Sequence, residues 1–400
     1  MTNTKTPDFQ ELPFRPRVLF AIHAMDGGGA ERQVIEILRH LDRKKFEPLI
    51  YLQTAAGVLM DEIPGDVPVY SFWERHPDYK RFPYGPVSWA QGRDLERLLE
   101  ELNIDVVYHR CYLMNLLASP ACQKTRVPQI ASTVADPEAE LKMHSKVGTW
   151  LSWLNARNCY EAADCVLANS EGLRQRNLEY FRLPEKHVQT IYNLFDFERI
   201  DRLAAESPPS WPRDQYHVVT VGRLDHRKGQ HVLIQALALL KKQEQLFSIH
   251  AHLLGKGVDE EKLRQMAVEL GVEQHVHFHG FQANPLPWVK AADLYNLSSL
   301  NEGMPNALVE AAACGTPIVA SDCPSGPSEI VIGDLLPVGD PQALATAILN
   351  HYQNPVSQAN LELQRNYVQE RFSWQTGMGQ LEAIMLKLGH RHRKMKRRPV

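Results

Sequence analysis

Short runs of apolar residues alternate along the chain with segments whose apolar residues recur at helical spacing. The first run, at residues 17–22, is followed by a glycine-rich loop and then by residues 34–41, which are apolar at every third or fourth position. The same order of strand, loop and helix returns at residues 216–222 and 231–241. Uniformly apolar strands separated by helices predict parallel sheets with both faces covered. The chain is therefore predicted to be an α/β protein in which each half opens with a βα unit.

Further apolar runs extend this pattern in both halves, and two of them end in polar side chains. His109 and Asp136 stand at predicted strand ends, where polar residues line the ligand crevice of a doubly wound sheet. A histidine in such a place also serves as a structural hydrogen-bonding residue, and both interpretations stay open here. Ser170 is expected to cap the helix that follows a third run. The runs are residues 104–110, 128–136, 165–170, 249–257, 276–281, 291–297 and 316–321.

The length of the chain favours two domains, because 400 residues exceed what one hydrophobic core usually holds. A proline-rich connector at residues 206–212 is the clearest boundary. We therefore expect two Rossmann-like doubly wound domains that face each other across a cleft, over residues 1–205 and 206–375. Residues 376–400 are expected to form a final helix that returns toward the first domain and a basic tail.

The stretch at residues 298–310 carries the densest candidate chemistry. Gly303 allows a tight turn, and Pro305 suits the first turn of the predicted helix after it. A helix start behind such a turn presents free N–H groups and a positive dipole end, which favour phosphate. Glu302 and Glu310 flank this phosphate site. Because carboxylates and phosphate repel each other, the two glutamates are better suited to bind hydroxyl groups. The pattern predicts a sugar-nucleotide site, and the plain alternative is a strand–turn–helix with two surface glutamates.

Two cations in the second half complement this phosphate site. Arg223 and Lys228 follow a predicted strand, and two cations opposite a helix N-terminus can hold a diphosphate. A solvated basic loop is the alternative. The glycine loop at residues 27–29 places backbone N–H groups at the edge of the first sheet. It lacks the G-x-G-x-x-G spacing of dinucleotide-binding folds, so a dehydrogenase is the least favoured function.

The composition, 44% hydrophobic and 23% charged, is that of a globular protein, and the net charge of -3 gives no general attraction to nucleic acid. No apolar run reaches the length of a membrane-spanning helix, and residues 1–16 lack the apolar region of a signal peptide. Six cysteines without C-x-x-C spacing predict free thiols in a reducing compartment and argue against a zinc site. We expect a cytoplasmic protein.

Two segments favour contact with a membrane surface. Residues 147–154 contain Trp150 and Trp153, a pattern that suits a helix resting on a membrane or gathering a lipid acceptor. Inward packing of both tryptophans is the alternative. The basic residues around this segment are Lys142, Lys146 and Arg157. Residues 391–398 are basic and contain no acidic residue, and we expect weak attachment of this tail to anionic lipid.

Taken together, these motifs resemble those of the family 4 retaining glycosyltransferases, whose two Rossmann-like domains form the GT-B fold. The resemblance covers most of the chain and is strongest over residues 218–340. Each motif alone is weak, and their order and spacing carry the resemblance. Residues 322–327 are similar to those of members that build surface polysaccharides and lipid-linked oligosaccharides. The motifs are Gly222-Arg223-Leu224 with Lys228-Gly229, Gly255-Lys256-Gly257, Gly280-Phe281, the Glu-x7-Glu pair of Glu302 and Glu310, and residues 27–32.

The resemblance implies transfer of a sugar, with retained configuration and without cofactor or metal, from a nucleotide-sugar to a glycan or lipid-linked acceptor. It implies that Arg223 and Lys228 neutralise the leaving diphosphate and that Glu302 contacts the sugar. Glu310 would hold the ribose hydroxyls. UDP is the nucleotide that the resemblance favours, with GDP next. The other donor-binding residues that it implies are Gly28, Gly29, Gly255, Phe281, Gly303, Met304, Pro305 and Asn306.

Two features depart from the family pattern. Many members have a histidine after the strand that here ends in Asp136, and this chain has none there. Either Asp136 or His109 then takes the acceptor-side role of that histidine, or the acceptor is contacted differently. The turn between Glu329 and Leu336 is shorter than usual, and no role in base or ribose binding is assigned to it. A sugar-nucleotide epimerase of the same fold and a non-catalytic nucleotide-sugar-binding protein are the rival functions. The presence of Arg223, Lys228, Glu302 and Glu310 argues against a non-catalytic protein.

Overall fold

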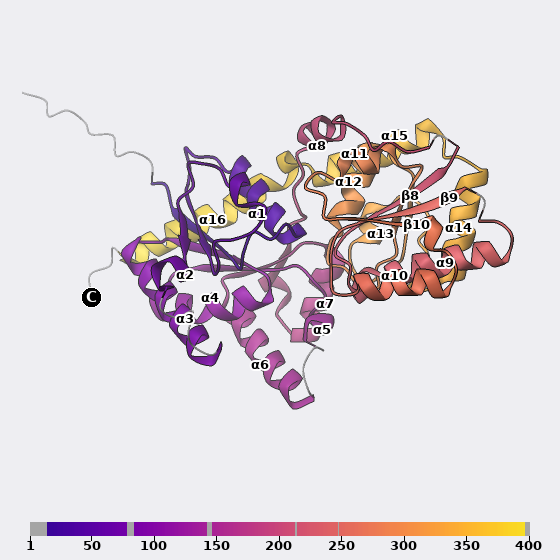
Figure 1. The fold of residues 1–400 in the computed structure, drawn as a ribbon. Helices are drawn as coiled ribbons and strands as arrows, with labels where there is room; N and C mark the ends of the chain where they lie inside the picture. Colours follow the sequence, from indigo (N-terminus) through magenta and orange to yellow (C-terminus); the bar gives the residue numbers. More distant parts are fainter. Residues whose placement is uncertain (1–13, 78–83, 142–145, 213, 247, 397–400) are drawn as a thin grey trace, which may run out of the picture.

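The computed structural model describes residues 14–77, 84–141, 146–212, 214–246 and 248–396. Two parallel sheets organise its two halves, with helices packed around each sheet (Figure 1). The seven-stranded sheet of the first half has the order β3-β2-β1-β4-β5-β6-β7. The five-stranded sheet of the second half has the order β10-β9-β8-β11-β12. The predicted architecture of two doubly wound α/β domains is confirmed.

The elements of the first half are β1 (Arg17–Ile22), α1 (Gly29–His40), β2 (Glu47–Leu52), β3 (Val69–Ser71), α2 (Phe72–Arg75), α3 (Tyr84–Glu101), β4 (Val106–Arg110), α4 (Tyr112–Thr125), β5 (Gln129–Thr133), α5 (Pro137–Leu141), α6 (Lys146–Ala162), β6 (Cys165–Ala168), α7 (Glu171–Phe181) and β7 (Val188–Thr190). Those that follow are α8 (Phe197–Ala204), β8 (Tyr216–Val221), α9 (Gln230–Lys242), β9 (Ile249–Leu254), α10 (Glu260–Glu269), β10 (Val276–Gly280), α11 (Leu286–Ala291), β11 (Leu294–Leu297), α12 (Asn306–Cys314), β12 (Ile318–Ala320), α13 (Pro327–Ile330), α14 (Pro341–Gln353), α15 (Gln358–Phe372) and α16 (Trp374–Lys396).

The uniformly apolar strands are buried on both faces, as β1 illustrates. Val18, Phe20 and Ile22 belong to the core cluster shared with α1 and α16. Leu19 and Ala21 point the other way and belong to the cluster shared with α3 and α4. Because side chains alternate along a strand, one apolar run supplies both layers of the core. All six cysteines carry free thiols, and most of them are buried.

Some strands are shorter than their apolar runs. The run at residues 291–297 becomes a strand only at Leu294, because α11 occupies the residues up to Ala291. Beyond β12, Leu336 adds one isolated bridge to Ser321 and no further strand of this sheet in the described residues. Apolar residues at a buried helix end and in a strand look alike in a sequence, so periodicity alone does not separate them.

The chain crosses between the halves before the proline-rich connector. Helix α8 already packs on α11 and α12, and its Phe197 and Ile200 join their core cluster. The crossing therefore precedes residue 206, the expected boundary. Helix α16 runs back over the first half (Figure 1), where Leu381 and Met385 enter the core cluster of α1.

The end of α16 is more ordered than the expected basic tail. Arg391 pairs with Asp164, and the guanidinium of Arg393 lies 4.4 Å from the ring centre of Phe14. His392 between them is buried. These residues belong to the helix that packs on the first half, and residues 397–400 of the tail lie outside the described residues.

The tryptophans of α6 differ in direction. Trp153 packs inward and donates from Nε1 to the carbonyl of Tyr180 at 2.9 Å. Trp150 is 58% exposed, and its neighbour Leu151 is 50% exposed. Lys142 lies outside the described residues, as does the side chain of Lys146. One tryptophan thus fits the structural interpretation and the other is available for a surface contact.

A row of imidazoles covers one face of the second sheet at β8, β9 and β10. His279 Nε2 lies 2.9 Å from His252 Nδ1, and His252 Nε2 lies 3.0 Å from His217 Nδ1. His217 Nε2 reaches the carbonyl of Pro212 at 3.0 Å, and Trp211 stacks on the row. A carbonyl can only accept, so each imidazole donates from Nε2 to the next Nδ1. The row is bonded throughout only while Nδ1 of His252 and of His217 is unprotonated and can accept.

We expect this row to make the protein less stable in mild acid. His250, two residues before His252 on β9, adds a second pair, because its Nδ1 lies 2.9 Å from His277 Nε2. Burial, followed by the neighbouring imidazoles, lowers the pKa of His252 to about 2, and burial with His275 and His277 lowers the pKa of His250 to about 4. The unfolded chain takes up these protons near pH 6.5, so stability falls between about pH 6.5 and 4. The loss is on the order of 1 kcal/mol per group, measured by denaturant unfolding at several pH values. His250→Asn should reduce this slope and the exposed His390→Asn should not; equal slopes would contradict the prediction.

Candidate functional site

Loops at the carboxyl ends of β8, β9 and β11 are joined to one another by main-chain hydrogen bonds. Leu224 N donates to Lys256 O at 3.0 Å, and Leu300 N donates to Arg227 O at 2.7 Å. Gly229 lies at φ +67°, and a Cβ there would stand 1.9 Å from the carbonyl oxygen of Ser298. Only glycine lets these two loops approach so closely. The three loops form one rigid platform.

Lys228 and Glu302 meet on this platform. Lys228 Nζ lies 2.6 Å from Glu302 Oε1, and the hydroxyl of Ser299 donates to the same oxygen at 2.7 Å. Glu302 is 8% exposed, so its carboxylate is held almost out of water. The ammonium group of Lys228 is partly exposed and is fixed at the edge of the platform. Arg223 lies in the same loop with an exposed side chain, and its carbonyl accepts from Gln230 Nε2 at 3.0 Å.

The start of α12 lies where the two halves meet. Pro305 is the N-cap, one position before the predicted first turn. The N–H groups of Asn306 and Ala307 find no acceptor among the residues that the structure describes. The side chain of Asn306 donates to Gly29 O at 3.1 Å and accepts from Asn193 Nδ2 at 2.7 Å. Free N–H groups at a helix start attract anions.

The glycine loop of the first half closes against these elements. Gly28 is the N-cap of α1, and the carbonyl of Gly29 receives the bond from Asn306. The ring of Phe281, after β10, lies over Gly27 and is 36% exposed. Gly255, at the end of β9, donates from its N–H to Gly280 O at 2.8 Å. The predicted donor-binding residues of both halves are thus brought to one region.

Contacts from the first half reach the turn before α12 as well. Ser170 caps α7, as predicted, and its hydroxyl also donates to Gly303 O at 2.8 Å. The sulfur of Met304 lies 3.3 Å from the amide nitrogen of Asn193. A Cβ on Gly303 would stand 2.1 Å from the carbonyl oxygen of Val134. The turn at residues 303–306 is therefore in close contact with the sheet edge of the first half.

Glu310 lies one turn into α12 and is half-buried. Burial raises the pKa of its carboxyl, and the charges of Arg32 and Arg199 act against that rise. No hydrogen bond or ion pair holds its carboxylate among the described part of the chain. A carboxylate near a helix start without a protein partner is available to accept bonds from ligand hydroxyls.

The two acceptor-side candidates do not face this region. His109 is fully buried, and its ring nitrogens lie 2.7 Å from Asn115 Oδ1 and 3.0 Å from Gln129 Oε1. Burial lowers the pKa of His109, so it is a neutral structural residue. Asp136 accepts from the N–H groups at the start of α5 and pairs with Arg176 at 2.8 Å. Both side chains are thus bonded to partners inside the first half, and their acceptor-side role stays a prediction.

Two half-buried carboxylates of the first half, Glu31 and Glu140, were missed by sequence reasoning. Burial raises the pKa of Glu140 to about 8, and the charge of Arg227 from the second half opposes this shift. Burial likewise raises the pKa of Glu31, which lies near enough to Arg223 to feel its charge. The charges of two arginines of the second half thus act on carboxylates of the first. The only sequence signal for Glu140 was its position four residues after a strand-end aspartate, which is too weak to single it out.

Glu329 begins the turn to which no role in base or ribose binding is assigned. In the structure it connects the second half to the first. Its carboxylate accepts from Glu171 N and Gly172 N, both at 2.9 Å, at the N-terminus of α7. The hydroxyl of Tyr192 donates to it at 2.8 Å. A carboxylate at a helix N-terminus is favourable, so this contact holds the two halves in the arrangement seen here.

A separate group of side chains of metal-ligating types consists of Glu36, His40 and Asp196, on α1 and at the start of α8. It is not on the loops that carry Lys228 and Glu302. In the part of the chain that the structure describes, no helix has both the length and the apolar character needed to cross a membrane.

Comparisons with known proteins match both halves. A family model of glycosyl transferases group 1 matches residues 215–354, and one of Glycosyltransferase Family 4 matches residues 27–199. The lipopolysaccharide core biosynthesis glycosyltransferase LpsE of Rhizobium meliloti is 30% identical over 333 residues, covering 82% of this chain and 86% of LpsE. The Campylobacter jejuni enzyme named N-acetylgalactosamine-N,N'-diacetylbacillosaminyl-diphospho-undecaprenol 4-alpha-N-acetylgalactosaminyltransferase is 27% identical over 321 residues, covering 77% of this chain and 81% of the enzyme.

Solved structures share the fold over nearly the whole chain. HepE of Anabaena, in complex with UDP and glucose, superimposes with a TM-score of 0.74 at 23% identity, over 93% of this chain and 100% of HepE. Sucrose-phosphate synthase of Thermosynechococcus elongatus gives a TM-score of 0.72 at 19% identity, over 95% and 99% of the two chains. The two parallel sheets and the sequence matches agree, and the chain belongs to the group 1 glycosyltransferases of GT-B fold.

Proposed function

We propose that this protein transfers a sugar with retained configuration from a nucleotide-sugar to a glycan or lipid-linked acceptor, without metal. The observation that carries the proposal is that Lys228 is held on Glu302, four residues before α12, whose first N–H groups have no acceptor among the described residues. Breaking the bond between sugar and diphosphate leaves negative charge on phosphate. A fixed ammonium and a helix start lower the energy of that charge without reorganising.

Each residue predicted for the donor side has a part in this proposal. Lys228 and Arg223 bind the diphosphate, and Glu302 contacts the sugar and stabilises positive charge near its anomeric carbon. Glu310 accepts hydrogen bonds from the ribose hydroxyls. With retention, the acceptor hydroxyl attacks on the face from which the diphosphate leaves, and the departing phosphate takes its proton. The residues that enclose the donor are Gly28, Gly29, Gly255, Phe281, Gly303, Met304, Pro305 and Asn306.

UDP is the proposed nucleotide, and surface polysaccharide or glycolipid synthesis is the proposed setting. HepE was crystallised with UDP, with UDP and glucose, and with UDP-glucose. Relatives are named for lipopolysaccharide core synthesis and for a diphospho-undecaprenol acceptor. These names support a nucleotide-sugar donor and a glycan or lipid-linked acceptor. Glu140, on which the charge of Arg227 acts, is a further residue of the first half that we assign to the acceptor side.

Donor screening tests this proposal. UDP- and GDP-sugars are incubated with the protein, and hydrolysis, transfer and thermal stabilisation are measured. Glu310→Ala is expected to lower kcat/KM about 10²-fold, because two hydrogen bonds to a charged group are lost at about 1.5 kcal/mol each. Glu261→Ala, an acidic position of α10 outside the platform, is the control. An altered sugar released without acceptor would indicate an epimerase, and nucleotide binding without turnover of any donor would indicate a non-catalytic protein.

We also propose that the protein works at the cytoplasmic membrane face, which suits a lipid-linked acceptor. Lys394 and Lys396 at the end of α16 are exposed. Because His392 and Arg393 pack on the first half, charge reversal is a cleaner test than deletion of the tail. Lys394→Glu with Lys396→Glu should weaken binding to anionic vesicles at least tenfold, at about 1 kcal/mol for each lysine lost. Trp150→Ser tests α6 separately, and unchanged sedimentation of both variants with vesicles would contradict the proposal.

A further inference from the structure

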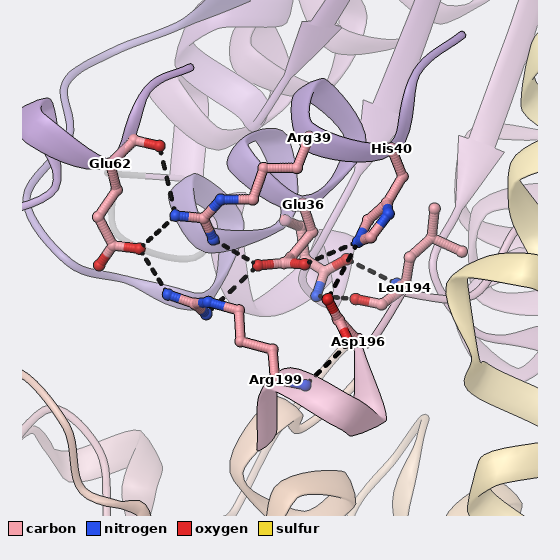
Figure 2. A network of polar contacts seen from close by, with 8 residues as sticks. Glu36, Arg39, His40, Glu62, Leu194, Asp196 and Arg199 are labelled. Atoms are coloured by element: carbon pink, nitrogen blue, oxygen red, sulfur yellow. Dashed lines mark hydrogen bonds and ion pairs between the residues drawn. The ribbon is translucent and has the colours of Figure 1, made fainter. Parts of the chain in front are cut away.

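Three side chains with metal-binding atoms converge where the first half meets the start of α8. Glu36 and His40 lie one turn apart on α1, and Asp196 is the N-cap of α8 (Figure 2). Their donor atoms all lie within 4.8 Å of one another. Two of these atoms, Glu36 Oε2 and His40 Nε2, are buried and have no hydrogen-bond partner in the described structure. Glu36 is itself only 8% exposed, so water does not replace the missing partner.

The spacing of these atoms suits an ion between them better than direct contact. His40 Nε2 lies 3.6 Å from Glu36 Oε2 and 3.6 Å from Asp196 Oδ2. A hydrogen bond needs about 2.7–3.2 Å between heavy atoms, so both separations are too long for one. Bonds of about 2.0–2.2 Å to a tetrahedral ion place neighbouring donors roughly 3.3–3.6 Å apart. A single proton on Nε2 would bond neither carboxylate well at these distances.

Surrounding groups hold the donors in place through their other atoms. Arg39 and Arg199 bind Glu36 Oε1, at 2.7 and 3.4 Å, and leave Oε2 free. Asp196 Oδ1 accepts from Arg199 N at 2.9 Å, which leaves Oδ2 directed at His40. The ring of His40 stacks on Trp374 at 4.2 Å. Partners of this kind orient the ligands of metal sites.

The arginines of this network leave room for a cation. Glu36, Glu62 and Asp196 carry three negative charges, and Arg39 and Arg199 carry two positive ones (Figure 2). The guanidinium groups bind Glu62 and the far oxygen of Glu36, so neither stands between the three donor atoms. The charge of Arg32 also acts on Glu62. Glu36 Oε2 and Asp196 Oδ2, which face His40 Nε2, are bound by neither Arg39 nor Arg199 and are the oxygens that a cation would take as ligands.

We propose that Glu36, His40 and Asp196 bind a divalent transition-metal ion, with Zn²⁺ as the best match to one imidazole and two carboxylates. Water would complete a tetrahedron. The ion would join α1, which begins at the glycine loop, to α8, through which the chain passes to the second half. Its role is structural, because none of its ligands lies on the loops that carry Lys228 and Glu302. The metal-free transfer proposed above is therefore unaffected.

The test uses the full chain, stripped with a chelator, and measures binding of Zn²⁺ by calorimetry without any sugar donor. We expect one site that is absent or at least tenfold weaker in His40→Phe, which keeps an aromatic ring against Trp374, and in Asp196→Asn, which keeps the helix cap. Glu62→Gln removes one negative charge nearby but no donor atom, and should change the affinity less than threefold. Co²⁺ should give the visible absorption of a tetrahedral ion in the wild type alone.

Failure of this inference is separate from failure of sugar transfer, because no turnover is measured. Circular dichroism of the metal-free variants shows whether each one folds, and Asp196→Asn remains decisive if His40→Phe does not fold. Equal Zn²⁺ binding in wild type, His40→Phe and Asp196→Asn would place the ion elsewhere, for example on the imidazole row, and overturn the inference. Absence of any binding by the wild type at micromolar Zn²⁺ would also overturn it.

Discussion

Replacing Lys228 with alanine is expected to lower kcat for sugar transfer about 10²–10³-fold, the usual loss when one fixed group that stabilises developing charge is removed. Nζ of Lys228 is held 2.6 Å from Glu302 Oε1 before any donor is bound, so the ammonium need not reorganise when the diphosphate leaves. The substitution also leaves the buried carboxylate of Glu302 with Ser299 as its remaining partner. Steady-state kinetics with the donor found by screening measures the effect.

Two further variants separate this role from a general loss of charge. Lys228→Arg keeps the charge but exchanges a compact ammonium for a planar fork, and we expect partial activity. Lys262→Ala removes a cation from the exposed face of α10, where its partner is Asp259, and should leave kcat unchanged. Full activity of Lys228→Ala with an unchanged melting temperature would show that the diphosphate is neutralised by other groups.

The elements that build the platform could be predicted because their signals are local. Gly303, Pro305 and the alanine-rich segment after them specify a turn and a helix within a few residues, and α12 begins at Asn306. Ser170 caps α7 for the same reason, since its hydroxyl bonds a backbone N–H three residues on. Local chemistry of this kind depends little on the rest of the fold.

Burial and partner choice could not be predicted, because they depend on packing between distant segments. His109 stands at the end of β4, and its ring bonds Asn115 and Gln129 in the interior. Glu140 follows β5 and is close enough to the second half for the charge of Arg227 to act on its pKa. The crossing at α8 was missed for a related reason. A proline-rich segment indicates a connector, but the core cluster that Phe197 joins is defined only once α11 and α12 are placed.

Gly303→Ala is expected to impair sugar transfer while both domains stay folded, because Gly303 lies in a close contact between the halves. The backbone of Gly303 is not in the left-handed region, so alanine is compatible with the turn itself. Its added Cβ would stand 2.1 Å from the carbonyl oxygen of Val134 and 3.1 Å from Asn169 Oδ1. Real Cβ atoms do not come so close to backbone oxygens, so the halves must separate.

Separation of the halves should slow transfer far more than it weakens nucleotide binding. The sugar-bearing site would move relative to the first half by a large fraction of an ångström or more, and a displacement of about 1 Å can cost 10²-fold in rate. The affinity for UDP should change less, because the platform of the second half stays intact. Small-angle scattering should show a larger radius of gyration. Gly379→Ala, at an open position of α16, is the control and should be slightly stabilised, by about 0.5–1 kcal/mol. Normal kcat together with unchanged scattering would mean that the contact at Gly303 is dispensable for catalysis.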